Sequence, residues 1–212
     1  MEIIASVEYN PDQMDAENIR FADRDRASGL HASQVIQSFS NTHLRSKSEQ
    51  RISFLDMTSR EKLEMYFHTE IGFIWEAMLS HYFRNRMISR RVREVSELQV
   101  QMPLSLDGIH LTPDGVDVAT DPWWLEEYKA TKKSMIKWEQ NPEKYFFDWL
   151  AQIKMYLKAI QSRHCRLFVY WVVGDWSRRG PSMWRYDLEF EQQEIDDNWA
   201  FMLQHAHDAD LF

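Results

Sequence analysis

The chain has 212 residues and a formal net charge of −8 at pH 7, with nine Trp, twelve Phe and eight Tyr. This length suits a single domain over residues 1–212, and the aromatic side chains can supply both core packing and surfaces that stack on bases. The single cysteine, Cys165, excludes a disulfide framework and any iron–sulfur cluster held by several cysteines of this chain. No apolar run approaches a membrane span and the N-terminus lacks the regions of a signal peptide, so we expect a cytoplasmic protein without a membrane partner.

The first half of the chain is predicted to be mainly helical. Residues 1 to about 30 are polar and charged, and we expect them to form an irregular arm. A helix is predicted from about His31, with Ser33 near its cap position, and the Ser-, Asn- and Arg-rich segment 40–52 is predicted as a loop. Apolar residues recur every three or four positions over residues 59–91, which predicts a long helical segment.

Alternation with period two then predicts strands. Residues 98–104 alternate as one strand, and residues 109–111 and 116–118 flank a Pro-Asp-Gly turn, which predicts a hairpin. Residues 123–130 follow as a third strand. The helical spacing returns over residues 143–161.

The C-terminal part is predicted as a strand pair and a helix, over about residues 166–207. Residues 167–173 form a continuous apolar run typical of a strand buried on both faces, residues 183–190 alternate, and residues 191–206 are helical. The whole order predicts an α/β (α+β) domain around one central mixed β-sheet flanked by helices.

One turn and one strand carry the residues best suited to chemistry. The turn is Thr112-Pro113-Asp114-Gly115, and the strand is Leu125-Glu126-Glu127-Tyr128-Lys129. Because side chains alternate along a strand, Glu127 and Lys129 point to one face. An aspartate, a glutamate and a lysine at one spot are the groups needed for metal-assisted phosphodiester hydrolysis. The carboxylates hold a hard divalent cation, and the lysine handles the attacking water or the phosphate charge.

Both features also have an ordinary structural explanation. Pro-Asp-Gly between apolar runs is a common turn, and Glu-x-Lys on a strand is often a cross-strand charge pair. The functional interpretation gains weight because Glu127 and Lys129 share their strand with Trp123, Trp124 and Leu125. Burial of such charges is costly unless they are paired or bind a metal. Asp117 is the most serious alternative to Asp114, because it lies only three residues away. Three other carboxylates also remain alternatives: Asp107, Asp121 and Glu126.

Two predicted helices add further candidates. Gln152 and Tyr156 are four residues apart and therefore share one helical face, where the glutamine can bind phosphate or orient a water and the tyrosine can support the helix. Upstream, Glu76 shares the apolar face of its helix with Gly72 and Leu79. A carboxylate on a core face suggests a metal ligand or an ion-pair partner.

Phosphate contacts depend on where basic residues cluster rather than on the net charge. Arg26 and Ser33 flank the start of a helix, where backbone N–H groups favour an anion, and Thr112 can add a hydroxyl. We expect these three residues to contact a substrate phosphate. The basic residues also form three groups, each of which could equally be a solvated face: Arg84, Arg86, Arg90, Arg91 and Arg93; Lys129, Lys132, Lys133 and Lys137; Arg178 and Arg179.

Taken in order, these motifs resemble the PD-(D/E)XK nuclease superfamily, most closely its RecB-like and phage lambda-exonuclease-like (YqaJ-type) branches. The resemblance spans about residues 26–157 and combines short motifs. They are Glu76 after a glycine in an upstream helix, Thr112-Pro113-Asp114-Gly115, Glu127-x-Lys129 and Gln152-x-x-x-Tyr156. Arg26 with Ala32-Ser33 is similar to the arginine and Ala-Ser pair that serve a 5′-phosphate pocket in that family.

The resemblance implies a restriction-endonuclease-like core and a metal-dependent DNA nuclease. It implies an exonuclease that degrades linear DNA from an end, in the 5′-to-3′ direction, in phage-type replication or recombination. The implied metal ligands are Glu76, Asp114, Glu127 and the Tyr128 carbonyl, which would hold one or two Mg²⁺ (or Mn²⁺) ions. Lys129 and Gln152 complete the implied catalytic set with Asp114 and Glu127, and no iron–sulfur cluster is expected.

The expected partners are DNA and a single-strand annealing or single-strand-binding protein, and an oligomer is compatible with the sequence. Three alternatives stay open. The first is a structure-specific or single-strand endonuclease of the same fold. The second is a catalytically inactive DNA-binding or recombination partner, against which the intact Asp, Glu and Lys set argues. The third is a globular protein with a surface charge pair and a tight turn.

Overall fold

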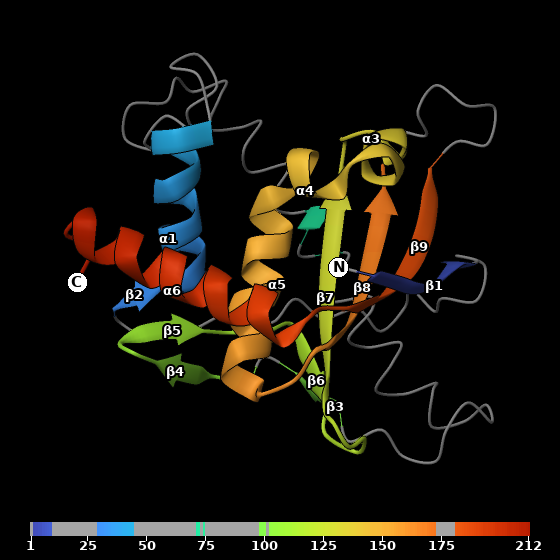
Figure 1. The fold of residues 1–212 in the computed structure, drawn as a ribbon. Coiled ribbons are helices and arrows are strands. Elements are labelled where there is room, and N and C mark those ends of the chain that lie inside the picture. The colour runs from blue at the N-terminus through green and yellow to red at the C-terminus, as the bar shows by residue number, and fades with distance from the viewer. Residues whose placement is uncertain are drawn as a thin grey trace.

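The structure, a computed structural model, describes residues 2–9, 29–44, 71–72, 74, 98–100, 102–172 and 181–212, with the backbone alone for residues 2–9 and 98–100. Figure 1 shows a strongly twisted sheet with helices gathered against one face. Among the described residues, no helix combines the length and the apolarity needed to cross a bilayer.

The larger sheet has six strands in the order β1-β9-β8-β7-β6-β3. Strands β7 and β8 pair in parallel, and the other neighbours pair antiparallel. Parallel neighbours need a crossover connection, which the helices between β7 and β8 supply. The strands are β1 (Glu2–Tyr9), β3 (Leu98–Val100), β6 (Gly115–Asp117), β7 (Trp124–Thr131), β8 (His164–Trp171) and β9 (Ser182–Glu189).

A smaller sheet has three strands in the order β2-β5-β4: β2 (Leu30–His31), β5 (Ile109–Leu111) and β4 (Leu104–Leu106). Strands β4 and β5 form a hairpin whose two turn residues, Asp107 and Gly108, have φ angles of 48° and 81°. Positive φ at both positions is what a two-residue hairpin turn of this kind requires, and Asp-Gly is a favoured pair for it.

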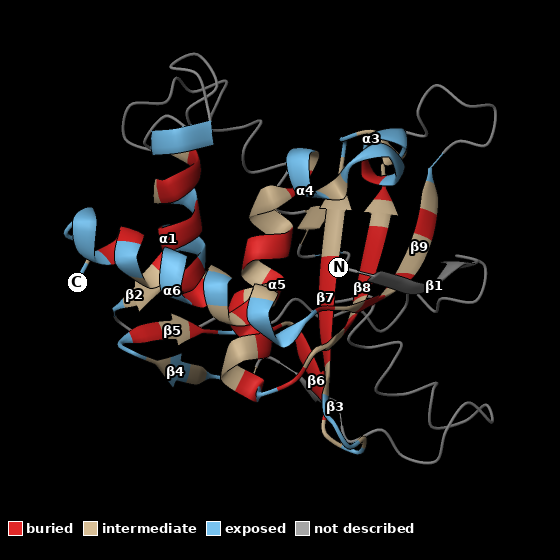
Figure 2. Ribbon diagram, viewed as in Figure 1, coloured by how far each residue is buried: buried red, intermediate tan, exposed pale blue. Residues whose placement is uncertain are grey.

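The helices are α1 (Ala32–Phe39), the π-helical turn η3 (Ser40–Leu44), α3 (Met135–Gln140), α4 (Pro142–Tyr145), α5 (Phe147–Ile160) and α6 (Gln192–Asp208). Helix α5 packs on β7 and β8, and α1 and α6 pack on α5 (Figure 1). Figure 2 shows buried residues along β7, β8 and α5, where Leu125, Ile153 and Leu167 are fully buried. This core fixes α5 against the strand that carries Glu127 and Lys129.

The predicted fold class is confirmed: the molecule is a mixed α/β domain with a central mixed sheet flanked by helices. The predicted strands at 123–130, 167–173 and 183–190 correspond to β7, β8 and β9. The helix predicted over 143–161 is present as α4 and α5, and the C-terminal helix as α6. Most of the predicted segment 59–91 lies outside the described residues, although Ile71, Gly72 and Ile74 are helical.

Several local predictions are wrong. Residues 109–111 and 116–118 do not form a hairpin, because β5 pairs with β4 in the small sheet while β6 pairs with β3 and β7 in the large one. The predicted strand 98–104 is divided between the two sheets, since Pro103 lacks the N–H that a continuous ladder needs. The arm is not irregular throughout, because residues 2–9 form β1 against β9.

Two further corrections concern the helices. The predicted loop 40–52 begins as the π-helical turn η3, and α3 lies in a segment for which no helix was predicted. Helix α1 begins where it was expected, with His31 as its cap residue, and Ser33 is its second helical residue. The His31 backbone N–H donates to Gln34 Oε1 at 2.8 Å, which satisfies a free donor at this helix end.

The helix layer contains a buried histidine that makes stability depend on pH. His205 on α6 lies 3.1 Å from Ser38 Oγ through Nε2 and edge-on to Phe39. Burial lowers the pKa of His205 below its usual value of 6.5, and His43 lowers it further against the opposing charge of Asp208. Because the pKa of His205 is lower in the folded state than in the unfolded chain, the unfolded chain takes up the proton first as the pH falls. The neutral His205 therefore contributes fully to the free energy of unfolding above about pH 6.5, and this contribution is lost at lower pH.

We therefore expect the urea midpoint of the protein to fall more between pH 7.5 and 5.5 than that of His205→Gln. Urea unfolding at both pH values for both proteins measures the difference. An identical pH dependence in the variant would remove His205 from this account.

Candidate metal and catalytic site

Strand β7 presents its charged residues to two opposite faces of the large sheet. Lys129 Nζ donates a hydrogen bond to Gln152 Oε1 on α5 at 3.0 Å, so Lys129 and, two residues before it, Glu127 face α5. The Glu126 and Tyr128 side chains lie on the other face. The predicted alternation along this strand is therefore present in the structure.

Asp114 is placed beside β7 by the pairing of β6. Strand β6 begins at Gly115, which lies opposite Glu126, and the Tyr128 backbone N–H donates to Asp114 Oδ2 at 2.9 Å. This bond holds the Asp114 carboxylate at the level of the strand that carries Glu127. Asp114 is half-buried, and its negative charge helps to raise the pKa of Lys129.

Lys129 links the two sides of the site. Its Nζ lies 2.5 Å from Glu127 Oε1 in addition to its bond to Gln152, and Gln152 Nε2 donates to the Tyr156 hydroxyl at 2.7 Å. The Glu127 side chain is 1% exposed and that of Lys129 is 18% exposed. Burial by itself lowers the pKa of Lys129, but the Glu127 and Asp114 carboxylates outweigh it and the net shift is upward. These neighbours stabilise the ammonium form.

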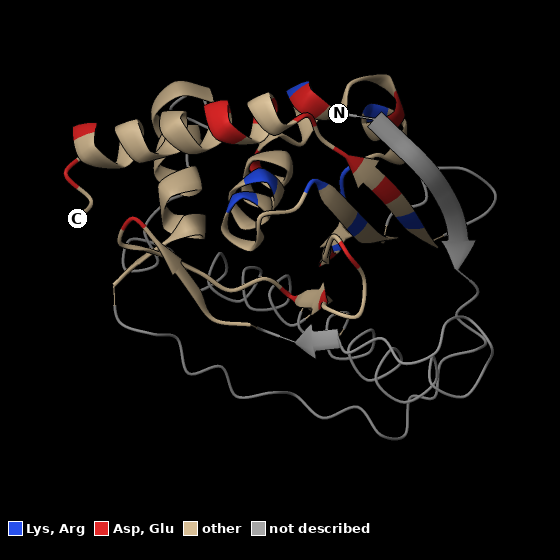
Figure 3. Ribbon diagram, turned by 60° about the horizontal axis from the view of Figure 1, so that its bottom comes forward, with Lys and Arg blue, Asp and Glu red and all other residues tan. Residues whose placement is uncertain are grey.

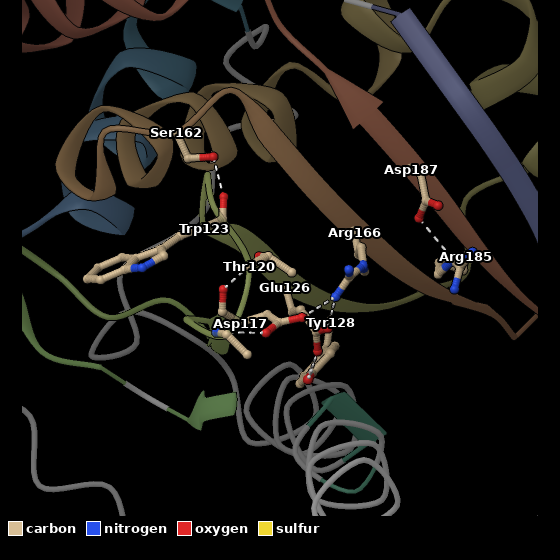
Figure 4. A network of polar contacts seen from close by, with 10 residues as sticks. Asp117, Thr120, Trp123, Glu126, Tyr128, Ser162, Arg166, Arg185 and Asp187 are labelled. Carbon is tan, nitrogen blue, oxygen red and sulfur yellow. Dashed lines mark hydrogen bonds and ion pairs between the residues drawn. The ribbon is translucent and has the colours of Figure 1, made fainter. Parts of the chain in front are cut away.

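The structure separates Asp117 from this set. Asp117 Oδ2 and Glu126 Oε1 both accept hydrogen bonds from Arg166 Nη1, at 2.9 and 3.1 Å, and the Tyr128 hydroxyl donates to Glu126 Oε2 at 2.9 Å (Figure 4). The Arg166 guanidinium also lies over the Trp124 ring at 4.7 Å. Asp117 and Glu126 are therefore bound to an arginine on the face away from α5. Asp114 is the aspartate next to Glu127 and Lys129.

Arg166 was not among the predicted functional residues. It directly precedes the apolar run of β8 and lies opposite Glu126 in the parallel register of β7 and β8. A charged residue at the start of a buried strand is an available sequence signal, but its partners depend on the strand order. Burial raises the pKa of Glu126, and the Arg166 charge opposes this shift.

The predicted phosphate contacts are described only in part, because Arg26 and Glu76 lie outside the described residues. Ser33 and Thr112 are both exposed. Strands β2 and β5 pair in parallel, with His31 opposite His110, so the segments that follow them leave the small sheet at the same edge. This arrangement brings the first turn of α1 towards the segment that leads to Asp114. The role of these residues in phosphate binding stays a prediction.

The donor chemistry of the site fits a hard cation. Asp114 and Glu127 supply two carboxylates, and carboxylate oxygens are the ligands that Mg²⁺ and Mn²⁺ prefer. In the part of the chain that the structure describes, no group of three or more His, Cys, Asp or Glu side chains is arranged to hold a metal ion. The further predicted ligands are Glu76 and the Tyr128 carbonyl, so the complete ligand set stays a prediction.

No protein-family model matches the sequence, and no curated protein matches it. Solved structures with a similar course of the chain include SSO0001, with 7% sequence identity and a TM-score of 0.45 over 85% of this chain and 78% of that chain. An alkaline exonuclease, LHK-Exo, from Laribacter hongkongensis has 14% identity and a TM-score of 0.44 over 86% of this chain and 88% of its own. The same exonuclease in complex with dAMP has 16% identity and a TM-score of 0.39 over 85% and 89% of the two chains.

Proposed function

We propose that the protein is a metal-dependent deoxyribonuclease that degrades linear DNA from an end, in the 5′-to-3′ direction, in phage-type replication or recombination. The observation that carries the proposal is the convergence of Asp114, Glu127, Lys129 and Gln152. Three different elements, the segment before β6, strand β7 and helix α5, bring these side chains together. The preference for DNA ends and the polarity come from the sequence resemblance.

Asp114 and Glu127 would hold Mg²⁺ or Mn²⁺, together with Glu76 and the Tyr128 carbonyl. A bound ion of this kind supplies Lewis acidity towards the phosphate and lowers the pKa of a coordinated water. The protein contributes the placement of the two carboxylates. Asp114 is held by the Tyr128 N–H at 2.9 Å, and Glu127 by the Lys129 ammonium.

Lys129 holds a proton at Nζ and has a compact charge that can face a phosphate oxygen or the attacking water. Its hydrogen bonds to Glu127 and Gln152 fix the direction of its side chain, so little reorganisation is needed when charge develops on the phosphate. Gln152 orients Lys129 and can itself donate to a phosphate oxygen. Tyr156 positions Gln152 from one turn along α5.

The test is cleavage of three end-labelled or closed substrates: linear duplex, single strands and closed circular duplex, each with Mg²⁺ and with EDTA. We expect Mg²⁺-dependent shortening of linear DNA and intact closed circles. Asp114→Asn should lose this cleavage, whereas Asp117→Asn should retain it in the fraction that folds. If none of the three substrates is cleaved in a metal-dependent way, the proposal that the protein is a nuclease is refuted. Cutting of closed circles would assign an endonuclease instead.

A graded pair of variants tests the Gln152 arm. Gln152→Ala removes the group that contacts Lys129 Nζ, and we expect a loss of about 100-fold in kcat. Tyr156→Phe removes one hydrogen bond to Gln152, so we expect a loss of about 2- to 10-fold, as one bond of roughly 0.5–1.5 kcal/mol allows. Single-turnover cleavage of linear duplex measures both. Equal losses in the two variants would contradict this order of contacts.

A further inference from the structure

Two exposed lysines lie over one aromatic ring where α3 meets α4, and a third exposed lysine lies beside them. Lys137 Nζ lies 5.4 Å and Lys144 Nζ lies 5.2 Å from the centre of the Tyr145 ring. Lys133 Nζ donates to the Tyr145 carbonyl at 3.0 Å and lies 5.0 Å from the centre of the Phe146 ring. We call Lys133, Lys137 and Lys144 the α3–α4 lysine cluster.

The cluster is mounted on a rigid base. Trp138 on α3 is 1% exposed and packs against Phe146 at 5.4 Å and Tyr186 at 5.1 Å between ring centres. Asn141 joins the two short helices, and its side chain accepts a hydrogen bond from the Lys144 backbone N–H at 2.9 Å. The backbone that carries the lysines is therefore fixed before any ligand binds, which lowers the entropic cost of binding.

The charge balance of this segment differs from that of the whole chain. Residues 131–144 contain four lysines and two glutamates, a formal charge of +2, whereas the chain carries −8. Within the described part of the chain, Lys137 and Lys144 make no ion pair, whereas Lys154 and Lys158 on α5 pair with the acidic helix α6. Figure 3 shows the acidic residues of α6 in red. Like charges around one ring repel each other, and an anionic ligand removes that repulsion.

The cluster lies next to the candidate site. The Lys133 backbone N–H donates to Thr131 Oγ1 at 3.0 Å, and Thr131 is the last residue of β7, two positions after Lys129. Two residues along a strand span about 6.6 Å. Figure 1 shows α3 and α4 at the end of the sheet where β7 and β8 finish. A nucleic acid strand has one phosphate per about 3.4 Å of helix axis, so a strand at the site would present its next phosphates to these lysines.

We propose that the α3–α4 lysine cluster binds the phosphate backbone of DNA within a few nucleotides of the bond that is cleaved. The inference rests on the proposed function for the position of that bond. Ammonium groups bind phosphates without regard to base sequence. This surface therefore raises the affinity for DNA and fixes the position of the strand relative to the candidate site, without reading the bases.

The experiment measures binding to labelled duplex and single-stranded DNA in EDTA between 50 and about 200 mM salt, the range over which phosphate contacts dominate the salt dependence. The test variant is Lys137→Gln/Lys144→Gln, and the control is Lys158→Gln, which removes a lysine paired with Asp196. All substituted side chains lie on the surface, so circular dichroism and thermal melting should match wild type. We expect the salt slope to fall by about 1.8 for duplex or about 1.4 for single strands in the test variant, and to be unchanged in the control.

Cleavage assays separate this inference from the proposed function. With Mg²⁺, the test variant should show a raised KM and an unchanged kcat. If no protein cleaves DNA but the slope falls as expected, the proposed function fails and the binding surface stands. If wild type cleaves DNA and the test variant keeps its slope and KM, the surface is refuted and the nuclease stands. Failure of wild type to bind DNA at all would also overturn the inference.

Discussion

Lys129→Met is expected to abolish Mg²⁺-dependent DNA cleavage, with a loss of at least about 10³-fold in kcat, while DNA affinity in EDTA stays near that of wild type. Removal of one preorganised charge or donor at a reacting centre typically costs about 10²- to 10³-fold, and Lys129 also holds Glu127 and Gln152 in place. Methionine keeps a flexible apolar stem of similar length without the ammonium. Single-turnover cleavage at saturating DNA, next to fluorescence anisotropy in EDTA, measures the two quantities.

A double variant separates catalysis from stability. Loss of Lys129 leaves the Glu127 carboxylate, 1% exposed, without its ammonium partner, which destabilises the fold. Glu127→Gln/Lys129→Met removes both charges, so we expect it to regain most of the stability of wild type and none of the activity. Lys129→Arg keeps the charge but replaces a compact ammonium by a planar group, and we expect less than about a tenth of the wild-type turnover. Retention of wild-type turnover in Lys129→Met would remove Lys129 from the mechanism.

The shared faces that the sequence predicts correctly are those of residues on the same element. Period-two alternation puts Glu127 and Lys129 on one face of β7, and i, i+4 spacing puts Gln152 and Tyr156 on one face of α5. The parallel pair of β7 and β8 then needs a helical crossover, and this places α5 on the sheet. Local periodicity is therefore sufficient to predict which of these side chains share a face.

The choice between Asp114 and Asp117 needed the strand order. Asp114 directly precedes β6 and Asp117 is its last residue, and a strand of three residues is too short for a pattern to set its register. The predicted hairpin turn at Pro113-Asp114-Gly115 is wrong, because the turn forms at Asp107-Gly108, and Asp-Gly is the stronger hairpin signal. Asp117 instead binds Arg166 on β8, which lies about fifty positions later in the sequence.

The α3–α4 lysine cluster is a surface feature that local sequence patterns predict only in part. Lys132, Lys133 and Lys137 are close in sequence and were recognisable as a basic group. Lys144 joins Lys137 only because Asn141 turns the chain between α3 and α4, and both ammonium groups then lie over Tyr145. A count of charges along the chain does not predict such convergence, since it depends on a turn whose geometry is set by packing of Trp138.

Arg166→Met is expected to lower the free energy of unfolding by about 3–5 kcal/mol, the range found when one partner of a buried ion pair is removed. The Asp117 and Glu126 side chains are 3% and 4% exposed, and Arg166 Nη1 donates to both. Without the guanidinium, the two buried carboxylates keep hydrogen bonds from the Tyr128 hydroxyl and the Ala119 backbone N–H among the described residues, but no longer share a positive partner there. Urea unfolding at pH 7 measures the loss.

The rescue of this variant distinguishes an uncompensated charge from a simple loss of packing. Asp117→Asn/Glu126→Gln in the Arg166→Met background removes both charges and retains the shapes of the side chains, so we expect most of the lost stability to return. A buried ion cluster replaced by neutral groups of similar volume is often neutral or stabilising, whereas a cavity persists whatever the charge of its lining. A triple variant as unstable as Arg166→Met would show that the methylene stem of Arg166, and its contact with the Trp124 ring, stabilises this face of the sheet.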